Sequence, residues 1–364
     1  MRKRLFSKLA IVMSTAIVVS GCFCPIDKAF VNAETIQDED DSYYDDDSDY
    51  DDSTDDSYDD STDDSYDDST DDSDNEETTG TKIDDVKLSS SELQAFIKES
   101  DSDENGYISQ SEAEKITYVS ISKKASQSDL TQIIKLYPNI SELMWNAGTL
   151  TKLTFPKNNI KRLNITSKAA SQLVISGINQ KLNNLSYTAQ GSKKYAFNFA
   201  KGSAYKKVED FNLMGKQING VKLSNAEVGT LYVTDTSAKK IDASSDKIIN
   251  LWVQNNKKLS SFTVRNCSKL KSVSCAYNAL SRLNISGCPK LLSVSCDRNK
   301  LTKLDISKYK NLKSISCGQN KLKKFDISKN KKLISVYCND NKLTELNTSK
   351  NKKLSYFGCS NNKL

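Results

Sequence analysis

Apolar residues recur through the C-terminal half of the chain at a fixed spacing of 21 residues, as at Leu270, Leu291 and Leu312. Four columns keep this spacing in register: Leu270, Leu291, Leu312, Leu333 and Leu354; Cys275, Cys296, Cys317, Cys338 and Cys359; Asn278, Asn299, Asn320, Asn341 and Asn362; Leu280, Leu301, Leu322, Leu343 and Leu364. Each unit contains a stretch L-x-x-[VIF]-x-C, whose alternation predicts a short strand with every second side chain facing inward. A fixed twenty-one-residue period predicts a solenoid in which stacked coils bury one continuous core.

The register weakens upstream but can still be followed. Further coils are predicted to start at Ile249, Val228, Val208, Leu182, Ile160 and Ile140. Ile116-x-x-Val119-x-Ile121 is interpreted as a first, atypical strand, which gives about twelve coils in total. Because so short a repeat leaves little room for a helix on the second wall, we expect extended or 3₁₀ segments there.

The repeat has the leucine-rich-repeat pattern with Cys in one Leu slot, and residues 83–364 resemble bacterial secreted leucine-rich-repeat proteins of the internalin-like type. The resemblance implies a surface binding protein, and it implies that the Asn column hydrogen-bonds the backbone as a ladder. We therefore expect a β-rich solenoid, a leucine-rich-repeat horseshoe over residues 123–364, behind a small helical cap at 83–122. The last repeat stops at Leu364 in mid-coil, so we expect either an incomplete chain or an end that packs on something else.

An acidic loop precedes the solenoid and matches the EF-hand pattern D-x-[DN]-x-[DN]-G-x₅-E. Its predicted Ca²⁺ ligands are Asp101, Asp103, Asn105, Tyr107 through its carbonyl, Ser109 and Glu112. Gly106 permits the sharp turn, and a helix bearing Leu93, Phe96 and Ile97 is predicted to start at a capping box of Ser89 and Glu92. The alternative is an acidic surface loop that matches by chance.

Residues 1–33 are typical of an export signal. A basic start is followed by an apolar run over residues 9–19, which is too short to span a bilayer. Two cleavage sites are predicted: one before Glu34, and a lipoprotein-type site that would make Cys22 a lipidated first residue. A lipid on Cys22 is the only membrane attachment that we expect, and both readings place the protein outside the cell at a bacterial surface.

Residues 34–80 carry 24 Asp and Glu and no Lys or Arg. Much of this segment repeats Asp-Asp-Ser-Thr and Asp-Asp-Ser-Tyr, and it resembles the serine–aspartate stalks of Gram-positive adhesins. It lacks the apolar residues needed for a core, so we predict a disordered, extended stalk over residues 34–82. Weak Ca²⁺ binding along it is the alternative.

The whole chain has no His, which excludes Ser-His-Asp triads, Cys-His pairs and His-ligated zinc. Residues 123–364 carry 43 Lys and Arg against 13 Asp and Glu. Stacked lysines, among them Lys303, Lys323 and Lys324, are candidates for binding teichoic acid, mucin or a glycosaminoglycan. The alternative is that they only keep the solenoid soluble. Interleaved Arg and aromatic residues are few, so no dedicated nucleic-acid readout is expected.

The outward strand positions form a second candidate surface. They are rich in serine at Ser272, Ser274, Ser293, Ser295, Ser314, Ser316 and Ser335. Tyr337 and Tyr356 add aromatic surface suited to binding a glycan or a protein. The alternative is that these serines and tyrosines are ordinary residues of an exposed β-sheet surface and bind nothing. The Cys column is expected to pack as small hydrophobes, because parallel Cβ vectors suit bridging poorly. Cys267 and Cys288 are expected to be more exposed, with a bridge between them left open.

No catalytic constellation is visible in the sequence. We therefore predict a non-enzymatic, Ca²⁺-stabilised extracellular binding or adhesion protein, whose partner is a host or envelope protein or glycan. One alternative is an envelope structural protein held to anionic wall polymers. Another is the binding arm of an enzyme whose catalytic domain lies beyond Leu364.

Overall fold

The computed structural model describes residues 79–223 and 227–364. The predicted signal segment, the lipidation site Cys22 and all but the last residues of the predicted stalk lie outside the described residues.

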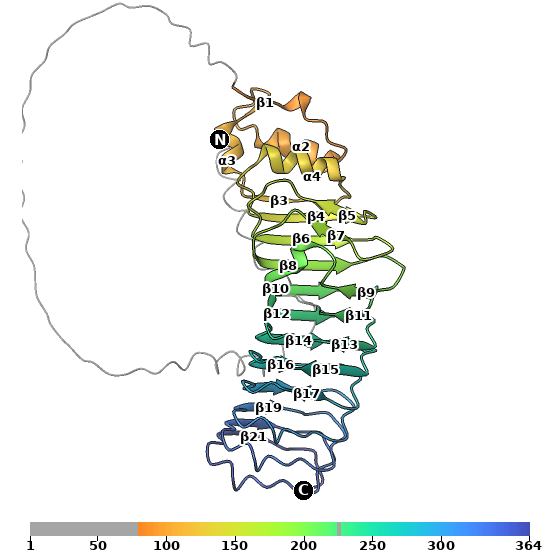
Figure 1. The fold of residues 1–364 in the computed structure, drawn as a ribbon, viewed down its shortest axis with the longest axis vertical. Helices are drawn as coiled ribbons and strands as arrows, with labels where there is room; N and C mark the ends of the chain where they lie inside the picture. The colour runs from red at the N-terminus through yellow and green to blue at the C-terminus, as the bar shows by residue number, and fades with distance from the viewer. Residues whose placement is uncertain (1–78, 224–226) are drawn as a thin grey trace, which may run out of the picture. The chain divides into compact units, whose positions relative to one another are not determined.

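A twelve-stranded parallel sheet runs the length of the solenoid (Figure 1). Its strands, in spatial order, are β3 (Tyr118–Ser120), β4 (Glu142–Gly148), β6 (Arg162–Ser167), β8 (Leu182–Ala189), β10 (Lys207–Met214), β12 (Glu227–Thr234), β14 (Asn250–Gln254), β16 (Ser272–Ser274), β18 (Ser293–Ser295), β19 (Ser314–Ser316), β20 (Ser335–Tyr337) and β21 (Tyr356–Gly358). Val273 pairs with Val294, and Val294 with Ile315, so that each residue pairs with its equivalent in the next repeat. The predicted solenoid, its period and its first strand at Val119 are thus confirmed.

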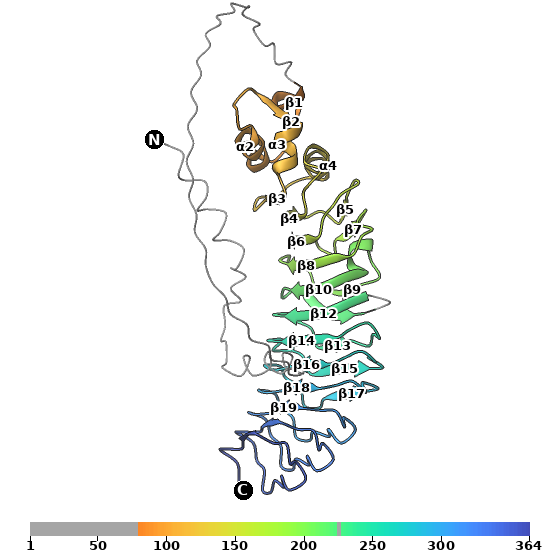
Figure 2. The same ribbon diagram turned by 90° about the vertical axis from the view of Figure 1, so that its left-hand side faces the viewer.

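A second wall faces this sheet, as the turned view shows (Figure 2). It contains β5 (Lys152–Thr154) paired with β7 (Val174–Ser176), and a five-stranded parallel sheet of β9 (Tyr195–Asn198), β11 (Ile218–Lys222), β13 (Lys240–Asp242), β15 (Ser261–Arg265) and β17 (Asn284–Ser286). One 3₁₀ turn, η2 (Ser203–Tyr205), interrupts it. In the coils after Ser286, turns and extended segments replace the strands of this wall, in line with the expectation of short convex segments.

The core lies between the two walls and changes in character along the solenoid. In the regular coils it consists of the Leu and Cys columns, and Leu270, Leu291, Leu312 and Leu333 are fully buried. In the longer coils upstream, buried aromatic rings replace them. Tyr187, Phe197 and Tyr205 meet edge to face, with ring centroids 5.1–6.1 Å apart. Larger side chains therefore fill the space where the regular register is lost.

The cap is larger than predicted. β1 (Gly80–Lys82) pairs antiparallel with β2 (Tyr107–Ser109), so the folded cap begins before the predicted boundary at Lys82. A short 3₁₀ turn, η1 (Ile83–Asp85), follows β1, and helix α4 (Gln127–Leu136) begins beyond the predicted cap boundary at residue 122. Leu130 and Ile133 of α4 are fully buried in the core that the solenoid shares.

The helix before the acidic loop starts one residue later than predicted. Helix α2 (Ser91–Ser100) has Ser90, not Ser89, as its N-cap, with the Ser90 hydroxyl 3.5 Å from the Leu93 amide. Glu92 does not complete a capping box. Its carboxylate instead accepts hydrogen bonds from the amides of Ser122 and Lys123, at 3.1 and 2.8 Å, because these are free at the start of the solenoid.

The cysteines of the Cys column pack as predicted, whereas the two cysteines of the turn, Cys267 and Cys288, do not. Cys275, Cys296, Cys317 and Cys338 are fully buried, and all seven cysteines of the described residues are unbridged. Cys359, the last of the column, is half-buried. The two turn cysteines, Cys267 and Cys288, were expected to be more exposed, yet they are 0% and 3% exposed. The reason is that their side chains fill the turn, where the Cys267 thiol lies 3.2 Å from the Ala243 carbonyl oxygen.

Candidate functional site

The acidic loop lies between α2 and α3 (Gln110–Lys115). Carboxylate oxygens of Asp101, Asp103 and Glu112 all lie within 4.8 Å of one another. Gly106 has a φ of +85°, the left-handed turn that the motif requires. None of the ion pairs within the described residues involves these three carboxylates. Three negative charges are thus held together without a cationic side chain paired to them.

Loop amides fix the direction of each carboxylate. Asp101 accepts hydrogen bonds from the amides of Asn105 and Gly106, at 3.2 and 2.9 Å. Glu112 accepts from the amides of Ser102 and Ser109, at 2.5 and 3.0 Å, and forms a capping box with Ser109 at the start of α3. The loop is therefore preorganised by its own backbone.

The pKa values of the loop carboxyls diverge. The Ser102 hydroxyl and the loop amides lower the pKa of Glu112 to about 2, against the effect of its burial. The pKa of Asp103 is raised although the Asn105 amide acts to lower it, because desolvation and the Asp101 and Glu112 carboxylates oppose its ionisation. Mutual repulsion of this kind is relieved when a cation binds between the groups.

The oxygen-only donor set fits a hard cation such as Ca²⁺, which takes six to eight oxygens. Asp101, Asp103 and Glu112 supply carboxylates, and Asn105 adds an amide oxygen that now accepts from the Tyr107 amide at 2.8 Å. The structure therefore brings together the carboxylates that the motif predicted.

A different candidate surface is the strand face, by which we mean the outward-facing side chains of the twelve-stranded sheet. At its centre the rings of Tyr232 and Trp252 stack, with centroids 6.1 Å apart and an angle of 15° between their planes. They occupy paired positions on β12 and β14, and both are half-buried. This pair was not predicted from the sequence, because it lies in coils where the repeat is degenerate.

Polar groups flank the stacked pair. In the strand register, Asn212 lies on one side of Tyr232, and Ser274 lies on the other side of Trp252. The Gln254 amide donates to the Ser274 hydroxyl at 2.5 Å. Burial, with a further contribution from the Asp210 carboxylate, raises the pKa of Tyr232. Aromatic surface framed by hydrogen-bonding groups is the usual composition of a binding surface.

The serine columns are less exposed than predicted. Ser274, Ser314 and Ser316 are buried, and Ser335 donates to Ser314 at 2.7 Å. Of the two tyrosines predicted to bind ligand, Tyr356 is 61% exposed and Tyr337 is half-buried. The strand face is thus open at Tyr356, on its last strand, whereas Tyr337 is no more open than the half-buried serines such as Ser295 and Ser335.

A half-buried acid beside the strand face was not predicted from the sequence either. Asp297 accepts hydrogen bonds from the hydroxyls of Ser295 and Ser316, at 2.9 and 2.7 Å, and from the Gly318 amide at 2.6 Å. Burial raises its pKa despite these donors. Its partners come from two neighbouring coils, so Asp297 ties those coils together.

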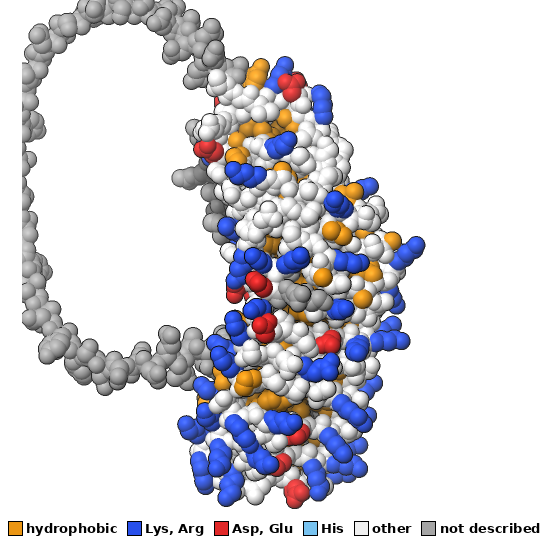
Figure 3. Space-filling model, in the orientation of Figure 1, with side chains coloured by type: hydrophobic (Ala, Val, Ile, Leu, Met, Phe, Trp, Pro, Cys, Tyr) orange, Lys and Arg blue, Asp and Glu red, His pale blue; other side chains and the backbone are white. Residues whose placement is uncertain are grey.

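The lysines predicted to bind ligand lie elsewhere. Lys303, Lys323 and Lys324 are exposed, and they lie outside the strands, on the segment that leads to the second wall. Lys324 faces Glu345 at 3.9 Å. The structure therefore does not combine these lysines with Tyr337 and Tyr356 into one site. Figure 3 shows lysine and arginine gathered over the C-terminal coils, with few acidic side chains among them.

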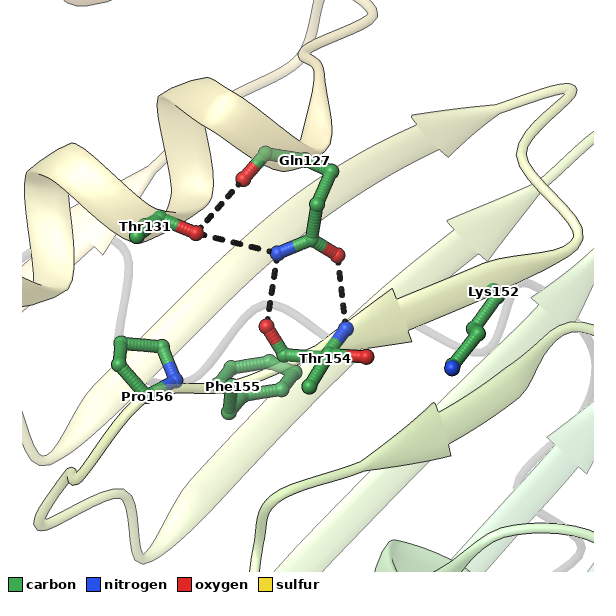
Figure 4. Close-up of a pocket in the computed structure, with 6 residues that line it drawn as sticks. All are labelled: Gln127, Thr131, Lys152, Thr154, Phe155 and Pro156. Carbon is green, nitrogen blue, oxygen red and sulfur yellow. Dashed lines mark hydrogen bonds between the residues drawn. The ribbon is translucent and has the colours of Figure 1, made fainter.

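A pocket lies where side chains of α4 are hydrogen-bonded to the backbone of β5 (Figure 4). The Gln127 side chain pairs with the backbone of Thr154, donating to its carbonyl and accepting from its amide, both at 2.7 Å. Gln127 also donates to Thr131 at 3.2 Å. Gln127, Thr131 and Thr154 thus satisfy one another, and Lys152, Phe155 and Pro156 complete the lining.

None of the helices within residues 79–223 and 227–364 combines the length and the apolar character needed to cross a bilayer.

Comparisons with known proteins find similarity in structure only. No family model matches the chain, and no curated protein matches it in sequence. Among solved structures, the functional domain of InlJ from Listeria monocytogenes, described as including a cysteine ladder, is 18% identical over 69% of this chain and 54% of its own, with a TM-score of 0.40. This chain thus spans about half the length of that structure.

Two further solved structures are similar to this chain. The internalin InlF from Listeria monocytogenes is 15% identical, covering 79% of this chain and 86% of its own, with a TM-score of 0.37. A leucine-rich-repeat protein from Leptospira interrogans is 17% identical, covering 66% and 76%, with a TM-score of 0.31.

Proposed function

We propose that this chain is a non-enzymatic binding protein that holds a macromolecular ligand, most simply a protein, on the strand face. The observation that carries the proposal is the stacked Tyr232–Trp252 pair at the centre of a rigid parallel sheet. Trp and Tyr dominate the energy of protein interfaces when they sit centrally among polar neighbours. A continuous sheet presents them without an entropic cost for ordering loops.

The test compares binding of the purified protein to host matrix proteins, mucin and bacterial cell wall. Trp252→Ala should weaken binding to the partner by at least about ten-fold, as expected for a central aromatic residue. Tyr118→Ala is the matched control, because Tyr118 is an exposed aromatic residue at the far end of the same sheet. Equal binding by the wild-type and Trp252→Ala proteins would show that the strand face is not the contact surface.

We also propose that the acidic loop binds Ca²⁺ and stabilises the cap. Asp101, Asp103, Asn105 and Glu112 would contribute side-chain oxygens, Tyr107 its carbonyl, and Ser109 a direct or water-mediated contact. Extracellular sites of this type bind with Kd values of about 10⁻⁴–10⁻³ M. A ten-fold excess of Ca²⁺ over Kd would then stabilise the fold by about 1.4 kcal/mol.

Thermal melts with Ca²⁺ and with EDTA test the metal site. Ca²⁺ should raise the melting temperature of the wild-type protein and leave that of Glu112→Gln unchanged. Glu114→Gln is the control, because Glu114 lies in the same helix as Glu112. Its carboxylate accepts a hydrogen bond from the Gln110 side chain and is not one of the predicted Ca²⁺ ligands. If wild-type protein melts at the same temperature with and without Ca²⁺, the site is wrong.

Export is the third element of the proposal. It is supported by the basic and apolar pattern of residues 1–19. Intact-mass analysis of protein recovered outside the cell should show either a lipid on Cys22 or an N-terminus at Glu34. Recovery of the protein with Met1 retained and no lipid would contradict export by either route.

A further inference from the structure

A column of buried side chains runs along the edge where the chain turns into each strand of the last coils. Tyr309, Asn330 and Asn351 occupy equivalent positions of successive repeats in this column, and they are 9%, 0% and 4% exposed. The Asn330 amide donates to the carbonyl of Tyr309 at 2.8 Å, and the Asn351 amide donates to the carbonyl of Asn330 at 2.9 Å. Hydrogen bonds between coils therefore fix the backbone of this edge.

Lysines flank each buried residue of the column and are all exposed. They are Lys308, Lys310, Lys329, Lys331, Lys332, Lys350, Lys352 and Lys353, and we call them the basic edge. Because the residue between each flanking pair points inward, its neighbours are held outward on the same edge, coil after coil. Paired strands lie about 4.8 Å apart, so the lysines form rows that follow the solenoid axis at that step.

Few carboxylates oppose these charges. None of the ion pairs within the described residues includes a lysine of the basic edge. Two carboxylates, Asp305 and Asp326, lie nearby. Each accepts a hydrogen bond from the backbone amide of the serine two residues later in the chain, at 2.9 and 2.8 Å. The third coil has Asn347 at the same position, so the edge is least neutralised there.

We propose that the basic edge binds a linear phosphodiester polymer laid along the solenoid axis. Its rows of ammonium groups match a ligand whose charge repeats along a chain, and each phosphate neutralised releases a counterion. The edge holds lysine and no arginine, and lysine binds phosphate as a point charge without the planar geometry of a guanidinium. Such contacts suit a flexible polymer, because an ammonium group does not require each phosphate to take one fixed position and orientation.

The rest of the lysine population provides a control. Lys300, Lys321, Lys342 and Lys363 form a separate row, where the chain has left each strand. Their backbone amides donate to the carbonyls of Leu280, Leu301, Leu322 and Leu343, each at 2.8 Å. They are exposed as well, but each coil contributes one lysine to this row and two or three to the basic edge. The proposal predicts a difference between variants that remove equal charge from these two sets.

The experiment measures the binding of full-length protein to poly(glycerol phosphate) at 50 and 200 mM NaCl. The edge variant is Lys329→Gln, Lys331→Gln, Lys350→Gln and Lys352→Gln. The control variant changes the four lysines of the other row to Gln. The acid-rich residues 34–80 are present in both variants, so they cannot cause a difference between them. We expect the edge variant to bind at least ten-fold more weakly at 50 mM NaCl, with a slope of log K against log salt reduced by about three.

The control variant should keep most of the wild-type affinity and salt slope. Equal losses in the two variants would overturn the proposal, because net charge alone would then explain them. Absence of wild-type binding at 50 mM NaCl would overturn it as well. Polyglutamate of matched charge is expected to bind more weakly, and equal binding would refute the phosphodiester assignment. Trp252→Ala should leave polymer binding unchanged, which separates this surface from the strand face.

Lysine acetylation footprinting tests the same contact without any variant. Saturating poly(glycerol phosphate) should protect Lys329, Lys331, Lys350 and Lys352 of the wild-type protein from acetylation, and leave Lys300 and Lys321 reactive. Uniform protection of all these lysines, or protection of none, would contradict a binding surface at the basic edge.

Discussion

At the scale of single residues, the Asn column explains why each coil keeps the same turn. The Asn320 amide donates to the carbonyls of Cys296 and Cys317, at 3.0 and 3.1 Å, and its oxygen accepts from the Leu301 amide at 3.0 Å. One residue earlier, Gln319 has a φ of +52°, a left-handed conformation that recurs in the regular coils. The side-chain amide thus satisfies buried backbone groups that the turn leaves without partners.

Replacing Asn320 by Ala should destabilise the protein by about 1–3 kcal/mol, because several buried backbone groups lose their partner at once. Urea unfolding followed by circular dichroism measures the change. Lys321→Ala is the control, since Lys321 is exposed and adjacent. Equal midpoints for the two variants would show that the column contributes nothing to stability.

At the scale of elements, α4 joins the cap to the solenoid through a buried acid at its start. Asp129 is fully buried and accepts from the amides of Ser89 and Ser126, both at 2.7 Å. Burial acts to raise the pKa of Asp129, but the hydroxyl and amide donors of Ser89 and Ser126 outweigh it and lower that pKa. One carboxylate thus caps a helix and fixes the segment that precedes α2.

This arrangement predicts a specific acid sensitivity. A carboxyl whose pKa is lower in the folded state contributes stability above its unfolded value of 3.8, and loses it as the pH falls through the folded pKa. Asp129→Asn should therefore lower the melting temperature at pH 7, and should flatten its dependence on pH below about 4. Asp85→Asn, at an exposed position, is the control. Parallel pH profiles for the wild-type and Asp129→Asn proteins would contradict this role.

At the scale of the whole molecule, most contacts join neighbouring coils. Each inner strand of the twelve-stranded sheet pairs only with the coil before it and the coil after it. Stability should then behave as a sum over coils and the interfaces between them. The regular coils from Cys267 onward are close to interchangeable, because the same columns recur in them.

Removing one whole coil tests this modularity. Deletion of residues 314–334 joins Lys313 to Ser335 and keeps every column in register, so the shortened protein should fold and melt at a moderately lower temperature. Deletion of residues 314–333 leaves one extra residue, which turns inward side chains outward and should disrupt the downstream coils. Limited proteolysis and circular dichroism distinguish the two. Equal stability of the two deletions would contradict a register set by inward columns.

The sequence by itself determined the features that depend on period and on local chemistry. Twenty-one-residue spacing specified the strands and the burial of Cys296 and Cys317, because every coil repeats the same environment. The ladder role of Asn320 was implied by the resemblance to leucine-rich-repeat proteins, and the structure bears it out. The spacing of Asp101, Asp103 and Glu112 was enough to predict that these carboxylates converge, since one short loop contains them all.

Only the tertiary structure decided features that arise between coils of different sequence. The carboxylate contact of Glu92 with the start of the solenoid and the burial of Cys267 depend on neighbours remote in the chain. The stacking of Tyr232 on Trp252 also depends on the pairing of two degenerate coils. Packing between coils, which no local pattern encodes, sets these positions.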